Sequence, residues 1–102
     1  MSIIGRDNRG VKWEGEINLD VEDDSSVIGM IDWTSSSGAE GTEFVEGSIA
    51  DDGNLDLEGV RVEGHGIVPC EYTGTWIYGV IRLRWVGHCP SGRAVGHDDD
   101  ED

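Results

Sequence analysis

Positively charged residues are scarce in this sequence: 7 Lys+Arg stand against 22 Asp+Glu, which gives a formal net charge of -15. Because Lys and Arg supply the contacts to phosphate groups, this balance argues against direct binding to nucleic acid or to anionic membrane surfaces. The sequence also lacks any apolar run approaching the ~20 residues of a membrane-spanning helix. Residues 1–12 lack the apolar stretch of a signal peptide. We therefore expect a cytoplasmic protein that makes no membrane contact.

Alanine is rare as well, at Ala39, Ala50 and Ala94, and no segment repeats its apolar residues with helical spacing. Glycine is abundant instead, with 16 of 102 residues scattered as turns and bulges require. With 36% hydrophobic residues and 4 Trp, the chain is too apolar to be a disordered acidic segment. Length and composition together predict one small β domain.

Alternation of apolar and polar residues, the period of a half-buried strand, recurs along the chain. In one strand, Ile28 and Met30 make the second face apolar too, so we expect that strand to be covered on both sides. Asp52-Gly53 predicts a hairpin turn, and a turn is also expected near Tyr78-Gly79. A change of apolar parity predicts a β-bulge at Gly59. The predicted strands span residues 13–22, 27–34, 42–49, 55–62, 68–76 and 81–85.

Six strands joined by short turns predict an all-β fold, an antiparallel six-strand meander. Such a sheet tends to curl, because closure removes exposed edges. We expect a small up-and-down barrel or a strongly coiled sheet. Residues 1–90 form the single predicted β domain, and residues 91–102, which lack periodicity and end in five acidic residues, are predicted to be a disordered acidic tail.

Part of the chain resembles a pattern in uncharacterised bacterial β modules. The pattern has a Trp strand, a Gly-Thr-Glu-aromatic-Val-x-Gly strand and a Leu-x-Leu-x-Gly strand, which match residues 31–33, 41–47 and 55–61 here. Tyr72 falls where those modules tend to carry a Tyr. The resemblance implies a non-catalytic β module, often appended to other domains, and implies no reaction and no ligand.

The two cysteines, Cys70 and Cys89, allow three interpretations. If the hairpin between them turns near Tyr78-Gly79, they lie within reach of one another, and His65 and His88 are close enough in sequence to complete a zinc site. Structural zinc sites usually show short paired spacings, which are missing here. We therefore favour two unlinked thiols and expect no metal. A disulfide is the third possibility, which the lack of a secretion signal disfavours.

Catalytic motifs are missing from the sequence. No Gly-x-Ser-x-Gly elbow and no phosphate-cradling loop with a Lys occurs. Cys89 follows His88 directly, but adjacent strand residues point to opposite faces and would not pair. Close pairs of carboxylates are unavoidable by chance among so many acids. We expect that the protein is not an enzyme and needs no cofactor.

The tryptophans allow two interpretations. Trp13, Trp33, Trp76 and Trp85 each lie on the apolar parity of a predicted strand, and filling of the core explains them most simply. They could instead line a cavity at a barrel mouth. On that alternative, the protein is a small-molecule or peptide-binding barrel whose ligand-binding residues are Trp33, Tyr72 and Trp76.

The acidic residues suggest a different function. Four of them share the outward face of the first predicted strand, and alternate residues of a strand lie about 7 Å apart, which is roughly twice the axial rise per phosphate in one DNA strand. The sequence thus favours a non-enzymatic binding module that acts through an acidic surface. The concrete hypothesis is a nucleic-acid mimic that inhibits a basic, nucleic-acid-handling protein. The alternatives for the charge itself are a solvated, soluble surface or the charge excess of a salt-adapted host. The expected partner-binding residues are Glu14, Glu16, Asp20 and Glu22.

Overall fold

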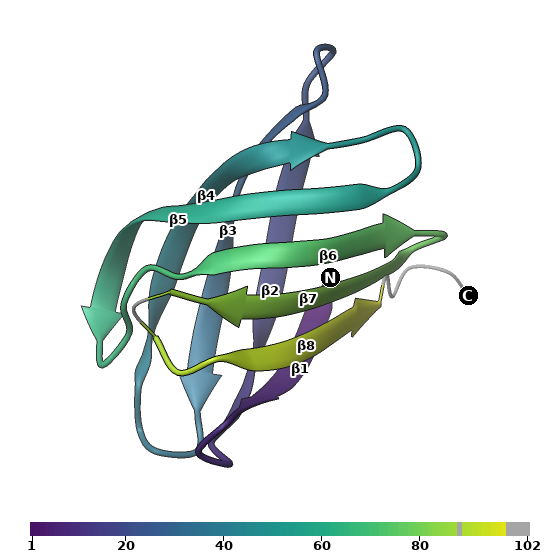
Figure 1. The fold of residues 1–102 in the computed structure, drawn as a ribbon. Coiled ribbons are helices and arrows are strands. Elements are labelled where there is room, and N and C mark those ends of the chain that lie inside the picture. Colours follow the sequence, from purple (N-terminus) through teal and green to yellow (C-terminus); the bar gives the residue numbers. More distant parts are fainter. Residues whose placement is uncertain (88, 98–102) are drawn as a thin grey trace.

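Eight antiparallel strands form a closed up-and-down barrel in a computed structural model that describes residues 1–87 and 89–97 (Figure 1). Each strand pairs with its neighbours in the chain, and β8 pairs with β1 to close the barrel. None of the described segments is a helix that could span a membrane. The strands are β1 Ser2–Asp7, β2 Lys12–Val21, β3 Ser26–Ser35, β4 Glu40–Ile49, β5 Asn54–His65, β6 Glu71–Ile77, β7 Val80–Val86 and β8 Gly92–His97.

One apolar core fills the barrel, built from the inward residues of every strand. Alternation places these side chains inside and their polar neighbours outside. The all-β barrel and the core positions of Trp33 and Trp85, each 5% exposed, are therefore confirmed. The buried core cluster comprises Ile3, Ile17, Val27, Ile31, Trp33, Val45, Leu55, Leu57, Tyr72, Ile81, Leu83, Trp85 and Ala94.

The expected number of strands was too low, because β1 and β8 carry little apolar signal. β8 lies inside the segment predicted to be a disordered tail, so that prediction is wrong for residues 92–97. The inward residues of β8 are Gly92, Ala94 and Gly96, which are small because large side chains of β7 fill the space beside them: a Cβ on Gly92 would meet the Trp85 ring at 2.5 Å. Residues 98–102 of the predicted tail lie outside the described residues.

The second face of β3 is not covered by the described part of the chain. Ile28 is 48% exposed and Met30 is 39% exposed on the outer wall of the barrel. The expectation of two covered faces is therefore wrong, because closure into a single-layered barrel gives every strand one inner and one outer face.

Four hairpins use the same five-residue connection, at residues 7–11, 22–26, 35–39 and 50–54. In each, the first N–H donates to the fifth carbonyl, the fourth N–H donates to the first carbonyl, and the fourth residue has a positive φ. This is a type I turn followed by a left-handed residue. Glycine fills that position at Gly10, Gly38 and Gly53, whereas Ser25 takes it with φ 72°. The predicted Asp52-Gly53 turn is thus confirmed.

The remaining turns and the bulge also follow sequence signals. Tyr78 and Gly79 both have positive φ, as a two-residue type I′ hairpin requires. The register of β4 against β5 passes from Phe44↔Arg61 to Val45↔Gly59, which leaves Val60 as the extra residue of a β-bulge. The bulge expected at Gly59 is therefore confirmed, although Val60 points outward and is 48% exposed.

The two remaining connections, β5–β6 (66–70) and β7–β8 (87–91), lie at the same end of the barrel as the 7–11 and 35–39 hairpins. We call this end the mouth. The other end carries the 22–26 and 50–54 hairpins and the Tyr78-Gly79 turn.

Candidate functional site

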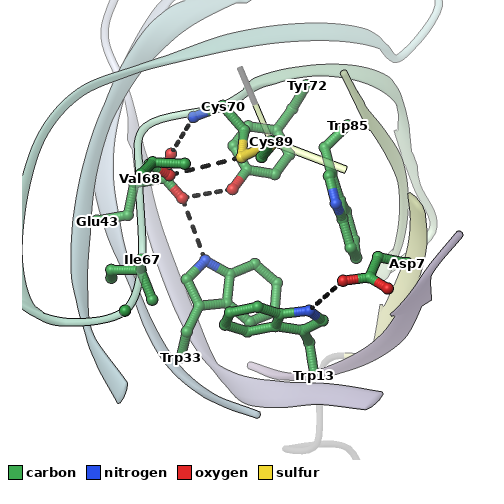
Figure 2. A pocket seen from close by; sticks show the side chains of 11 residues that line it. Asp7, Trp13, Trp33, Glu43, Ile67, Val68, Cys70, Tyr72, Trp85 and Cys89 are labelled. Atoms are coloured by element: carbon green, nitrogen blue, oxygen red, sulfur yellow. Dashed lines mark hydrogen bonds between the residues drawn. A yellow bond between two sulfur atoms is a disulfide. The ribbon is translucent and has the colours of Figure 1, made fainter. Parts of the chain in front are cut away.

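A cavity of ≈ 50 Å³, partly open to solvent, lies inside the mouth of the barrel (Figure 2). By the same measure one water molecule needs roughly 10–15 Å³, so the cavity has room for several waters or for one compact organic group. Its wall comprises Asp7, Trp13, Trp33, Glu43, Gly66, Ile67, Val68, Cys70, Tyr72, Trp85 and Cys89.

Four aromatic rings form a continuous arc around the cavity (Figure 2). The ring centroids of Trp13 and Trp33 are 5.9 Å apart, those of Trp33 and Trp85 are 5.9 Å apart, and those of Tyr72 and Trp85 are 6.3 Å apart. The three pairs of planes are inclined by 80°, 59° and 61°. The rings therefore surround a space from several directions and do not form a parallel stack.

Glu43 places a carboxylate inside the barrel, where its side chain is 1% exposed. It accepts hydrogen bonds from Trp33 Nε1 at 3.2 Å, from the backbone N–H of Cys70 at 2.9 Å and from the Tyr72 hydroxyl. Burial raises the pKa of Glu43, and the bonds from Tyr72, Cys70 and Trp33 partly offset that rise. The pKa of Tyr72 is also raised, first by burial and then by the charge of Glu43.

The bulge in β5 makes room for this carboxylate. A Cβ on Gly59 would lie 2.1 Å from Glu43 Oε2, and the Gly59 N–H donates to the Cys70 carbonyl at 2.8 Å. Residue 59 therefore has to be glycine for Glu43 and the start of β6 to meet here.

A second buried carboxylate, Asp7, lies across the cavity at the end of β1 and is 6% exposed. It accepts bonds from Trp13 Nε1 at 3.1 Å, from Arg9 Nη2 at 2.8 Å, and from the backbone N–H groups of Arg9 and Val11. Burial acts to raise the pKa of Asp7, but the hydrogen bonds from Arg9, Trp13 and Val11 outweigh it and lower the pKa to about 2. Asp7 is thus an ionised group whose charge Arg9 neutralises.

A disulfide joins Cys70 and Cys89, whose Cα atoms are 6.0 Å apart. The preference for two unlinked thiols is therefore wrong. The β6–β7 hairpin brings the β5–β6 and β7–β8 connections together, because its register pairs Glu71 with Val86. Among the described residues no group of three or more His, Cys, Asp or Glu could hold a metal ion, and His88 lies outside them. The bond ties the 66–70 and 87–91 connections together beside the cavity.

The structure brings two of the three sequence-predicted ligand residues to the cavity. Trp33 and Tyr72 line it, but Trp76 does not. Trp76 shares the inward parity of Tyr72 yet lies four residues further along β6, or roughly 13 Å away, and packs against the core toward the other end. No sequence pattern marks Glu43 or Asp7 as a site residue, although Glu43 has the same parity as the core residue Val45.

Glu14, Glu16 and Asp20 of β2 face outward as expected, and all three are exposed, as is Glu22 directly after the strand. Two of them already have a positively charged neighbour: Lys12 Nζ lies 3.7 Å from Glu14, and the N-terminal amine lies 3.2 Å from Glu16. The row of acids along this strand is therefore partly neutralised at one end.

Charge is segregated around the outer wall. On the neighbouring strands β7, β8, β1 and β2, the register places cationic residues directly opposite one another. The four that form this row are Arg84, Arg93, Arg6 and Lys12. Across β4, β5 and β6, the register instead sets Glu46 beside Glu58 and Glu58 beside Glu71. Like charges directly opposite one another are destabilising, so neither row helps the sheet to form.

Comparison with known proteins gives a fold and no function. No family model and no curated protein matches the sequence. A redesigned β-barrel, mFAP1, solved bound to DFHBI, is similar to this chain with a TM-score of 0.77 and 9% sequence identity, over 95% of this chain and 90% of that one. At this identity the likeness shows the closed barrel fold alone.

Proposed function

We propose that the protein is a non-catalytic barrel that binds a small ligand in the cavity at its mouth. The observation that carries the proposal is the arc of Trp13, Trp33, Trp85 and Tyr72 around a partly open cavity that also holds the buried carboxylate of Glu43. Ligand sites are typically concave and apolar, with few polar groups that fix orientation, and they occur in the mouths of barrels. A similar barrel was solved bound to DFHBI, which supports the same use of this fold.

The four tryptophans supply the test. Three indole N–H groups, of Trp13, Trp33 and Trp85, lie at the cavity, and that of Trp76 lies toward the other end. A screen of small soluble compounds by ¹⁵N-resolved NMR should yield ligands that shift the first three signals and leave Trp76 in place. Ligands that shift Trp76 equally, or no ligand from a broad screen, would refute the proposal.

A matched pair of variants sharpens that test. Val68 lines the cavity and is 47% exposed, whereas Val60 is 48% exposed on the outer wall. Val68→Trp should block the mouth and weaken binding by about tenfold or more, which corresponds to about 1.4 kcal/mol. Val60→Trp should leave the affinity unchanged.

A second candidate function rests on the outer surface. We propose it because Glu14, Glu16, Asp20 and Glu22 share one exposed face of the outer wall. Such a surface would bind a basic protein, and a nucleic-acid-handling protein is the hypothesis that the sequence favours.

Neutralising the β2 acids tests this second function. The variant combining Glu14→Gln, Glu16→Gln, Asp20→Asn and Glu22→Gln should lose a basic partner that the wild type captures at low salt, since such contacts weaken as salt rises. The control neutralises Glu46, Asp56, Glu58 and Glu71 instead. Equal capture by the β2 variant, or capture that salt does not weaken, would move the interface elsewhere.

A further inference from the structure

The charge balance of the cavity is incomplete, and this limits which ligand can enter it. A buried charge is costly unless an opposite charge or a metal compensates it. Asp7 has its partner in Arg9, at 2.8 Å. For Glu43, no salt bridge occurs among the described residues, and its three hydrogen-bond donors are neutral.

The described wall of the cavity carries no Lys, Arg or His. The positively charged side chains of β7, β8 and β1 project from the outer wall, as the exposure of Arg84, Arg93 and Arg6 shows. No cation in the described part of the chain lies beside the Glu43 carboxylate in the cavity, so nothing there compensates the charge of this group once it is ionised.

The aromatic rings of the cavity wall can stabilise a cation that compensates the charge of Glu43. Indole and phenol rings attract cations over their faces within about 6 Å of the ring centroid, and Trp does so most strongly. Trp33, Trp85 and Tyr72 have centroids 5.9 and 6.3 Å apart along the arc, with planes inclined by about 60°. A compact group at the centre of such an arc contacts several rings at once. Figure 2 shows Trp33 and Tyr72 beside Glu43, to which both donate hydrogen bonds, and Trp85 across the cavity from it.

We propose that the cavity binds a compact organic cation, an alkylated ammonium group, between the rings of Trp33, Trp85 and Tyr72 and beside the carboxylate of Glu43. An alkylated ammonium suits the site better than a bare one, because Glu43 already receives three hydrogen bonds and the rings offer no acceptor for N–H groups. A cavity of ≈ 50 Å³ limits the group to a few heavy atoms. This inference rests on the proposed ligand-binding function.

The test compares two probes of the same shape. Choline carries a trimethylammonium group, and 3,3-dimethylbutan-1-ol carries a neutral tert-butyl group in its place. Titration of each, followed by the indole N–H signals, should give at least tenfold tighter binding of choline, with shifts at Trp33 and Trp85. The titrations are made in 0.5 M NaCl, which screens the attraction of any cation to the acidic exterior.

Two variants assign the preference to Glu43. Glu43→Gln should remove most of the preference for choline and leave the binding of the neutral probe nearly unchanged. Glu46→Gln, an exposed acid on the outer face of the same strand, should alter neither. If Glu43→Gln does not fold, Trp85→Phe, which keeps a ring, should retain more choline affinity than Trp85→Leu.

The outcomes separate this inference from the function on which it rests. Equal binding of both probes, or tighter binding of the alcohol, would overturn the cation inference and leave the barrel a binder of neutral ligands. Binding of neither probe would also overturn it, and the compound screen then decides the proposed function independently. Choline shifts confined to Trp76 or to the outer wall would count against both.

Discussion

Glu43 shows how a single residue can set the pH response of a small barrel. Its carboxylate is almost fully buried, and burial raises its pKa more than the three hydrogen bonds lower it. The folded protein therefore holds the Glu43 proton more tightly than the unfolded chain does. Ionisation of this group costs the folded state free energy that it does not cost the unfolded state.

Comparison with Glu43→Gln should reveal that cost. Because the folded pKa lies above the unfolded value, the wild type should lose stability relative to the variant as the pH rises from below 4.5 through the folded pKa. The slope of the difference is at most about 1.4 kcal/mol per pH unit for one proton. Urea unfolding of both proteins between pH 3.5 and 8 measures it; a difference that grows in favour of the wild type with pH would contradict the prediction.

Some residues of the cavity could be predicted from the sequence, and others could not. Trp33 and Tyr72 could be assigned to the interior from their parity alone. Glu43 shares the parity of Val45, but a carboxylate among 22 acids gives no sign of burial. Trp76 was grouped with Trp33 and Tyr72 although it does not line the cavity, because parity tells which face a side chain takes and not at which end of the barrel it lies.

The repeated hairpin connection is the clearest feature at the level of elements. Gly10, Gly38 and Gly53 occupy its left-handed position, where residues with a Cβ are strained, and Ser25 occupies the fourth example. Ser25→Gly should stabilise the protein by about 0.5–1 kcal/mol, since relief of that strain outweighs the greater freedom of glycine in the unfolded chain.

Gly38→Ser is the reciprocal control, because it places a serine in the same position of the 35–39 hairpin. Gly38→Ser should lower the free energy of unfolding by a comparable amount. Denaturant titration of both variants gives the two free energies of unfolding. A loss of stability in Ser25→Gly would show that the serine makes a contribution that the turn geometry does not explain.

The disulfide links the β5–β6 and β7–β8 connections, which flank the β6–β7 hairpin. It closes a chain segment with a sequence separation of 19. For a loop of this length, the lower entropy of the cross-linked unfolded chain predicts a stabilisation of about 3 kcal/mol. Replacing both cysteines by serine should lower stability by that order, with the 66–70 connection losing hydrogen-exchange protection before the strands do. Unchanged stability would indicate that the mouth connections are held by packing alone.

The same bond bears on the environment of the protein. A cytoplasmic location remains a prediction from the sequence, whereas disulfides persist mainly in oxidising compartments. Mass spectrometry of the protein from its native source, with thiols alkylated before lysis, distinguishes the two.

At the scale of the whole molecule, closure depends on strands that the sequence hardly reveals. β1 contributes Ile3 and β8 contributes Ala94 to the core, so neither shows the apolar alternation by which the six central strands were predicted. The small inward residues of β8 make sense only once the neighbouring strand is known. The barrel could be expected from the chain, but its number of strands could not.

Two truncations test the role of β8. Ending the chain after Pro90 removes β8, opens the edges of β1 and β7, and should prevent stable folding. Ending it after His97 removes none of the contacts that the structure describes and should leave the thermal midpoint within a few degrees. Circular dichroism melts of both proteins measure this; cooperative folding of the shorter one would mean that closure is dispensable.

The pairing of Ser2 with His97 brings the first and last described strands into register. Each of the eight strands then has two neighbours around the barrel, so the chain ends could lie at any of the hairpins without changing which strands pair. A gene that joins the end of β8 to the start of β1 through a short linker and starts anew within the exposed 36–38 loop should encode the same barrel, since permutation succeeds at such loop tips when the ends that are joined lie close together. Matching NMR spectra of the two proteins would show that the fold has an order of neighbours but no obligatory first strand.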